Sequence, residues 1–145
     1  MKDEQVVQLL RQMRHDFGNH LQVISSYLDL GRLDEIRKYI HSLAEDMAEE
    51  RIIFASRTPE AALYFYRQLL MARERGINMR YQDLSVASIK VLEKYEEPLQ
   101  SVIKVAAAAD NKRLSVSVHE GEPGNMLIYI SLEGETEPVI VSVME

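Results

Sequence analysis

An apolar stripe near the N-terminus constrains the fold of this 145-residue chain more than any other feature. Its members follow one another at steps of 4, 3, 4, 4, 3 and 4 residues, which is the spacing of one side of an α-helix. They are Val6, Leu10, Met13, Phe17, Leu21, Ile24 and Leu28. The stripe predicts one long helix from about Asp3, a suitable N-cap residue, to about Leu30, with Gly31 ending it.

A second helix is predicted directly after the connection 32–34, with Asp34 as its N-cap. Two helices joined by so short a connection form an antiparallel hairpin. A hairpin with one continuous apolar face cannot bury that face alone, so either the rest of the chain or a second copy must cover it. Because these helices are long for a domain of this size, we expect two copies of the chain to form a homodimer with a four-helix bundle. In the second helix the stripe continues through Ile36, Ile40, Leu43 and Met47, with Phe54 near the end.

The sequence pattern changes near residue 55. Thr58 and Pro59 are typical of a helix start, and Gly76 is typical of the end of that helix. The other predicted elements are a strand at 77–81, a helix from Ser85 or Ser88 to about Ala109 that Pro98 interrupts, and strands at 113–119, 126–133 and 139–144, with a hairpin turn at 121–125. The predicted fold class is α+β, with a helical hairpin at 1–55 and a small α/β sandwich at 56–145.

Composition excludes several functions. Lysine and arginine number 17 and aspartate and glutamate 23, giving a net charge of −6, whereas a nucleic-acid-binding protein needs a basic face. The chain has no cysteine, which excludes disulfides, thiolate zinc sites and cysteine nucleophiles. None of the four histidines has metal-ligand spacing with another, so we expect no metal site. No apolar run has the length of a membrane span or a signal peptide, and we therefore expect a soluble, cytoplasmic protein.

A polar stripe in the first helix is the candidate functional site. In the segment RHDFGNHLQ (14–22), His15 points away from the apolar stripe, because successive residues turn by about 100° around a helix. Four residues share its side of the helix at i−4, i+3, i+4 and i+7: Arg11, Gly18, Asn19 and Gln22. Gly18 costs about 1 kcal/mol relative to alanine inside a helix, and it leaves room for a docking protein. The alternative interpretation is a solvated helix face that contains a histidine.

The segment RHDFGNHLQVISSYLDLG resembles the phosphoacceptor helix of citrate-sensor-type histidine kinases. It resembles more closely that of the sporulation initiation phosphotransferase B family. Those helices carry an Arg-His-Asp/Glu-aromatic-x-Asn-x-Leu pattern, on which His15, Asp16, Asn19 and Leu21 fall. A weaker resemblance from Leu69 to Arg80 relates the second half to the ATP-binding domain of the kinases.

The second half departs from that kinase domain in the residues that hold nucleotide. The helix SVIKVAAAADN contains only Asn111, at its very end, where the kinases have several asparagines, and no Asp-x-Gly-x-Gly motif occurs in the chain. We therefore expect a degenerate ATPase-like domain and no autophosphorylation.

The resemblance implies a phosphotransferase of a sporulation-type two-component phosphorelay. His15 would accept a phosphoryl group from the aspartate of one response-regulator receiver domain, form phosphohistidine, and pass the group to another receiver without using ATP. Asp16 would orient the imidazole, and Asn19 would contact phosphoryl oxygens or the partner. No intrinsic cofactor is expected, because Mg²⁺ would come with the receiver domain. The residues expected to contact the partner or the phosphoryl group are Arg11, Arg14, Gly18 and Gln22.

Two other functions stay open at this point. In one, the bundle binds a receiver or a kinase as an inhibitor or scaffold without being phosphorylated. In the other, the chain is a shortened ATP-dependent histidine kinase. Substitution of His15 by glutamine separates the first from a phosphotransferase, and nucleotide binding without a partner would indicate the second.

Overall fold

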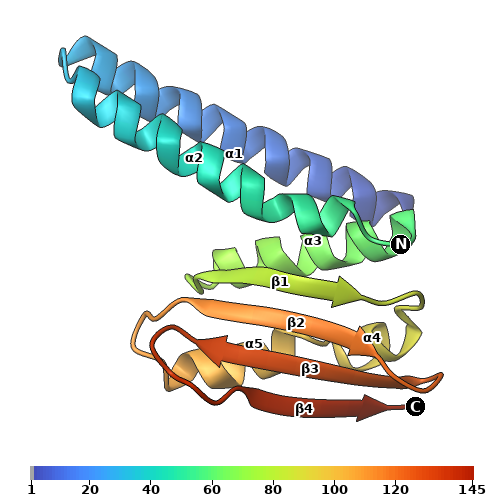
Figure 1. Cartoon of the computed structure of the whole chain (residues 1–145). Coiled ribbons are helices and arrows are strands. Elements are labelled where there is room, and N and C mark those ends of the chain that lie inside the picture. The colour runs from blue at the N-terminus through green and yellow to red at the C-terminus, as the bar shows by residue number, and fades with distance from the viewer. Residues whose placement is uncertain (1) are drawn as a thin grey trace. The chain divides into compact units, whose positions relative to one another are not determined.

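The computed structural model describes residues 2–145, which are α+β with an N-terminal helical region and a four-stranded sheet, as predicted. The chain divides into two compact units, Met1–Glu49 and Glu50–Glu145. In chain order the elements are α1 (Asp3–Asp29), α2 (Leu33–Phe54), α3 (Pro59–Glu74), β1 (Met79–Ser85), α4 (Lys90–Tyr95), α5 (Leu99–Ala107), β2 (Leu114–Glu120), β3 (Asn125–Leu132) and β4 (Val139–Met144) (Figure 1). No helix of the described chain is both long and apolar enough to cross a membrane.

The first unit is a hairpin in which α1 and α2 run antiparallel (Figure 1). Gly31 follows α1 with a φ of +70°, a conformation that glycine adopts without strain, so the predicted helix end is confirmed. The predicted N-caps are wrong by one or two residues. The cap of α1 is Lys2, whose backbone N–H donates to Oε1 of Gln5 over 3.1 Å, and Asp34 lies inside the first turn of α2.

The apolar stripe of the hairpin is largely exposed in this single chain. Phe17 is 64% exposed on α1, and Met47 is 70% exposed on α2. The neighbouring side of α1 turns toward α2, because Nδ1 of His20 lies 2.6 Å from the hydroxyl of Tyr39. Stripe members on α1 with more than two-fifths of their surface exposed are Leu10, Met13, Phe17, Leu21 and Leu28.

The second unit is built on a sheet of order β1-β2-β3-β4, in which β1 and β2 are parallel and the other pairs antiparallel. The parallel pair needs a crossover, which α4 and α5 supply. The helices α3, α4 and α5 lie on one face of the sheet (Figure 1). Alternate residues of β2 and β3 are buried toward them: Leu114, Val116, Val118, Met126, Ile128 and Ile130.

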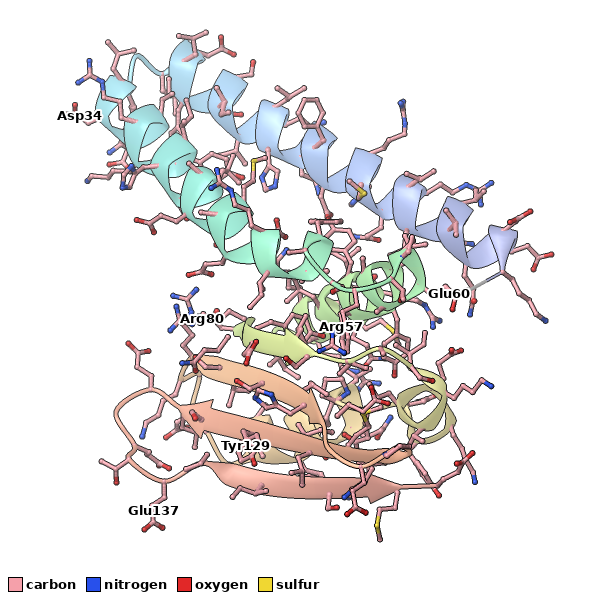
Figure 2. All side chains as sticks on the ribbon, turned by 45° about the vertical axis from the view of Figure 1, so that its right-hand side comes forward. Asp34, Arg57, Glu60, Arg80, Tyr129 and Glu137 are labelled. Atoms are coloured by element: carbon pink, nitrogen blue, oxygen red, sulfur yellow. The ribbon has the colours of Figure 1, made fainter. Side chains whose placement is uncertain are left out.

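The other face of the sheet carries partly exposed, mostly polar side chains. There the ring of Tyr129 meets the imidazole of His119 edge-on, with centroids 5.7 Å apart. Nε of Arg80 donates to the hydroxyl of Ser115 over 3.1 Å. Figure 2 labels Tyr129 and Arg80 on their strands.

The start and end of α3 agree with the sequence prediction. The hydroxyl of Thr58 accepts the backbone N–H of Ala61 over 3.1 Å, Pro59 opens the helix, and Gly76 follows its end with a φ of +74°. Tyr64 of this helix is buried, and its hydroxyl donates to the backbone carbonyl of Glu97 over 2.6 Å. Burial, reinforced by nearby carboxylates, raises the pKa of Tyr64, so its phenol stays protonated and keeps donating.

Two predicted boundaries in the second unit are wrong. The first strand covers Met79–Ser85 and not 77–81, because it pairs with β2 across a register shift after Tyr81. Ser85 therefore ends a strand and does not begin a helix, and α4 starts at Lys90, beyond Ser88.

Pro98 interrupts the following helix, as predicted, and separates α4 from α5. Buried side chains hold this break. Oε1 of Gln68 accepts the backbone N–H of Leu99 over 2.9 Å, and the carboxylate of Glu97 accepts both the backbone N–H and the hydroxyl of Ser101.

Candidate functional site

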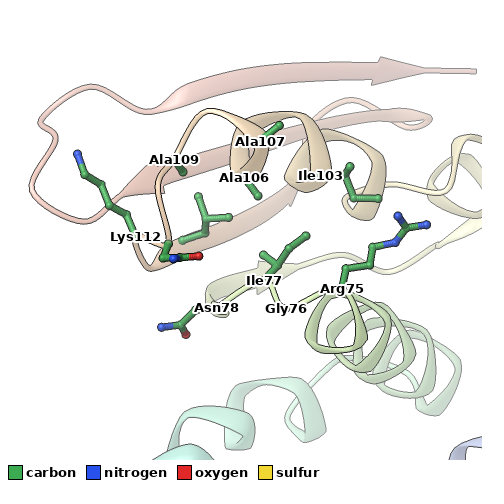
Figure 3. Close-up of a pocket in the computed structure, with 11 residues that line it drawn as sticks. Arg75, Gly76, Ile77, Asn78, Ile103, Ala106, Ala107, Ala109 and Lys112 are labelled. Atoms are coloured by element: carbon green, nitrogen blue, oxygen red, sulfur yellow. The ribbon is translucent and has the colours of Figure 1, made fainter.

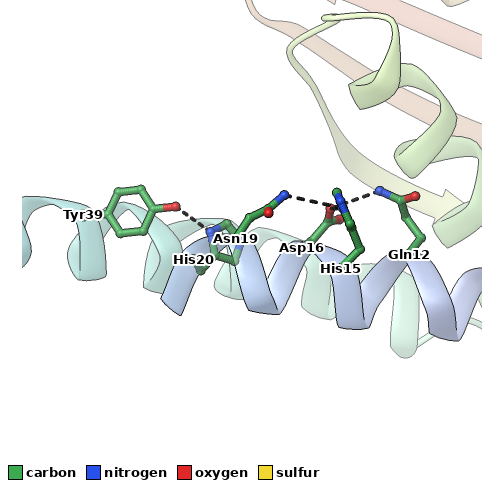
Figure 4. Close-up of polar contacts among 6 residues, drawn as sticks. All are labelled: Gln12, His15, Asp16, Asn19, His20 and Tyr39. Atoms are coloured by element: carbon green, nitrogen blue, oxygen red, sulfur yellow. Dashed lines mark hydrogen bonds and ion pairs between the residues drawn. The ribbon is translucent and has the colours of Figure 1, made fainter. Parts of the chain in front are cut away.

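His15 lies in the first half of α1, with 70% of its side chain exposed. His15 and three polar side chains within about one turn of it form a row along the helix (Figure 4). This polar row consists of Gln12, His15, Asp16 and Asn19. The helix positions it, because residues three and four apart are neighbours on a helix surface.

Two neighbours approach the same ring nitrogen of His15. Nδ2 of Asn19 lies 3.4 Å from Nδ1 of His15, and Oδ1 of Asp16 lies 3.7 Å from that Nδ1. The other ring nitrogen, Nε2, makes no hydrogen bond or ion pair within residues 2–145. The polar row therefore contacts the imidazole at Nδ1 and leaves Nε2 available to a partner.

The two contacts favour different tautomers of the neutral ring. An N–H of Asn19 that donates to Nδ1 requires the proton on Nε2, whereas the Asp16 carboxylate favours a proton on Nδ1. A half-turn of the Asn19 amide brings its oxygen to Nδ1, and both neighbours then favour Nδ1–H. In that tautomer Nε2 carries an exposed lone pair, which is the form that can act as a nucleophile.

Gln12 belongs to the row, although it was not among the residues predicted from the sequence. Its amide Nε2 donates to Oδ1 of Asp16 over 3.0 Å. Gln12 and Asp16 are both half-buried, whereas His15 is exposed. The signal that points to Gln12 is its spacing of four residues from Asp16, at which glutamine and aspartate pair on a helix.

The expected partner-contacting residues lie on α1 and take no part in the row. Arg11, Arg14 and Gln22 are exposed, and none has a hydrogen bond or ion pair in the described structure. A Cβ added at Gly18 would meet nothing within 4 Å. No crowding within this chain requires glycine there, and the space beside Gly18 is open.

The remaining histidines have protein partners. His20 bonds Tyr39 within the hairpin, Nε2 of His41 lies 3.3 Å from Glu45, and Nε2 of His119 lies 3.5 Å from Asp83. Within the described chain, no cluster of three or more His, Asp or Glu side chains could hold a metal ion.

The second unit contains a cavity of about 300 Å³ beside the α3–β1 connection and the end of α5 (Figure 3). Arg75 and Lys112 contribute two cationic side chains to its lining, and Lys112 also lies 3.9 Å from Glu135. Asn111 lines it too, just beyond α5 and with a φ of +64°. Asn111 therefore lies outside α5. In the kinases that the sequence resembles, the asparagines that hold nucleotide would lie within the corresponding helix.

The sequence of residues 1–56 matches the family described as sensor kinase SpoOB-type, alpha-helical domain. The hairpin is therefore similar in sequence to the alpha-helical domain of SpoOB-type proteins. The similarity extends past the SpoOB-type hairpin, because 135 residues are 24% identical to sporulation initiation phosphotransferase B of Bacillus subtilis strain 168. That alignment covers 90% of this chain and 70% of the relative. The family resemblance expected from the sequence is thereby confirmed.

Proposed function

We propose that this chain is a histidine phosphotransferase of a sporulation-type two-component phosphorelay. It accepts a phosphoryl group on His15 from the aspartate of one response-regulator receiver domain and transfers it to another, without ATP. The observation that carries the proposal is that His15 is 70% exposed on this hairpin and that its contacts with Asn19 and Asp16 lie at Nδ1, which leaves Nε2 without a partner among the described residues. The name of the Bacillus relative supports the reaction type.

The transfer needs few groups from this chain. An imidazole is to a large extent neutral near pH 7, so the Nε2 lone pair of His15 can attack the phosphorus of an aspartyl phosphate. The new N–P bond forms as the P–O bond breaks, and the electron pair leaves on the receiver carboxylate. The ring then carries a positive charge with a proton on Nδ1, which Asp16 stabilises from 3.7 Å. The reverse step, at a second receiver, regenerates neutral His15.

When a receiver domain docks, basic side chains near His15 can compensate the negative charge of its acidic site. Arg11 and Arg14 are exposed on α1 near His15 and can approach the acidic site of a receiver domain. The magnesium ion of the reaction comes with the receiver, and we propose no intrinsic cofactor for this chain. Since response regulators act in the cytoplasm, this function would place the chain there.

The proposed assembly is a homodimer in which two hairpins form a four-helix bundle. The exposed stripe on α1 and α2 supports it, since a contiguous apolar surface of this kind is typical of an interface. A second copy fits because both helices of the hairpin carry stripe residues. The bundle would bear two His15 side chains, one from each copy.

We propose that the second unit is a degenerate ATPase-like domain. Its helices on one face of a mixed sheet support this assignment. The absence of an Asp-x-Gly-x-Gly motif argues against kinase activity.

The test is transfer from phosphorylated receivers of the same organism, charged with radiolabelled acetyl phosphate and freed of it before mixing. Wild-type chain should acquire acid-labile, base-stable label within seconds to minutes in the absence of ATP, and His15→Gln should acquire none. His41→Gln is the matched control, because it removes another exposed histidine of the same hairpin. Receiver binding without any label on the wild type would instead support a scaffold.

A further inference from the structure

We infer that Gln12 is a positioning residue that acts on His15 through Asp16. It fixes the carboxylate beside Nδ1 and thereby favours the tautomer whose lone pair is on Nε2. This inference deepens the phosphotransfer function proposed above and rests on it.

The geometry links the three residues through one atom. Oδ1 of Asp16 accepts the Gln12 amide over 3.0 Å, and the same Oδ1 lies 3.7 Å from Nδ1 of His15 (Figure 4). An aspartate next to the histidine in sequence would ordinarily point to another side of the helix. The bond from Gln12 selects the Asp16 rotamer that keeps Oδ1 near the imidazole.

The chemistry of the amide suits this role. A hydrogen bond from a neutral N–H stabilises an ionised carboxylate without neutralising its negative charge. The ionised Asp16 attracts the proton of His15 to Nδ1, and it stabilises the positive ring that forms when Nε2 bonds phosphorus. No additional proton donor or acceptor is needed in that step.

Few other charges compete at this position. Arg11 and Arg14 lie on the same helix, at i−4 and i−1 from His15, and neither forms an ion pair in the described chain. Asp16 is the only charged side chain of residues 2–145 within ion-pair distance of His15, whether on α1 or elsewhere. A change at Gln12 should therefore reach the imidazole through Asp16.

The first readout needs no activity. Nitrogen chemical shifts of His15 in unphosphorylated protein, recorded where the ring is neutral, give the ratio of Nδ1–H to Nε2–H forms. Gln12→Ala should lower this ratio about threefold, because the half-buried hydrogen bond that holds Oδ1 of Asp16 beside Nδ1 is lost. Gln12→Glu should lower it similarly, because a carboxylate keeps the size of the side chain but cannot donate to Asp16.

The second readout is the rate of phosphoryl transfer from a labelled receiver. Gln12→Ala should slow it about threefold to fivefold. In an Asp16→Asn background, the same change should alter the rate less than twofold, as expected for residues that act as one unit. Gln8→Ala is the matched control, because it removes an exposed glutamine one turn earlier on α1.

Unchanged tautomer ratios in both Gln12 variants would overturn the inference. An undiminished Gln12→Ala effect on the rate in the Asp16→Asn background would also overturn it. If the wild type accepts no phosphoryl group, the proposed function fails, and the tautomer ratio alone then decides whether Gln12 positions Asp16.

Discussion

Oδ1 of Asp16 lies 3.7 Å from Nδ1 of His15, the residue that precedes it in α1. Consecutive residues on a helix do not face each other, so the sequence gives little reason to expect this approach. It follows from the side-chain conformation of Asp16, which Gln12 holds from the preceding turn. The imidazole is thereby contacted at Nδ1 only, and Nε2 remains open for chemistry.

Removing the negative charge beside His15 should slow phosphoryl transfer. Asp16→Asn is expected to lower the initial rate about fivefold to tenfold, because a charge-assisted contact to the positively charged ring is lost. Asp29→Asn removes a carboxylate from the end of the same helix and should leave the rate within twofold. Equal rates for Asp16→Asn and the wild type would show that Asp16 has no role in orienting the imidazole.

The bond between His20 and Tyr39 should stabilise the hairpin without serving the reaction. Tyr39→Phe removes the hydroxyl that lies 2.6 Å from Nδ1 of His20, and it should lower the free energy of unfolding by about 1 kcal/mol in a urea melt. Tyr27→Phe is the control, because that half-buried hydroxyl has no hydrogen bond in the described structure. The transfer rate of Tyr39→Phe should stay near that of the wild type, and a large loss of rate at normal stability would place His20 in the mechanism.

A charge on the apolar stripe should separate the proposed dimer. Phe17 is 64% exposed in the single chain, so Phe17→Glu should leave the hairpin folded but disrupt packing against a second copy. Sedimentation at micromolar concentration should show a dimer for the wild type and a monomer for this variant. Ile140→Glu, at a 59% exposed position of β4, should remain dimeric. A monomeric wild type under the same conditions would contradict the four-helix bundle.

The buried amide of Gln68 should matter for the stability of the second unit. It is 3% exposed and accepts the backbone N–H of Leu99 at the start of α5. Gln68→Leu leaves that N–H unsatisfied and should cost about 1–3 kcal/mol in unfolding free energy. Gln100→Leu, which removes only an exposed bond to Glu96, should cost much less. Similar losses in the two variants would indicate that the Leu99 N–H is solvated in the native state.

The regular parts of the fold could be predicted from the sequence because they depend on local signals. Thr58, Pro59 and Gly76 determine α3 through its own backbone groups, and alternation in β2 and β3 marks the face buried under the helices. The predicted start of β1 was wrong because the register of this strand depends on pairing with β2, which lies more than thirty residues away. The same holds for the bond from Leu99 to Gln68, which joins residues 31 positions apart.

The candidate site was predicted in part. Helical spacing placed Asn19 beside His15, as the structure has it. The four residues predicted to share the side of His15 included neither Asp16 nor Gln12. The placement of these two side chains depends on their rotamers and hydrogen bonds, which cannot be predicted from the pattern of apolar and polar residues.

A reconstituted relay without ATP tests phosphoryl transfer through His15 most directly. One receiver is charged with label, purified, and mixed with a second, uncharged receiver, with and without this chain. Phosphoryl transfer through His15 predicts that label reaches the second receiver only when the wild-type chain is present and passes through an acid-labile intermediate. With His15→Gln, no label should reach the second receiver. Label that reaches the second receiver equally well with His15→Gln would contradict phosphoryl transfer through His15.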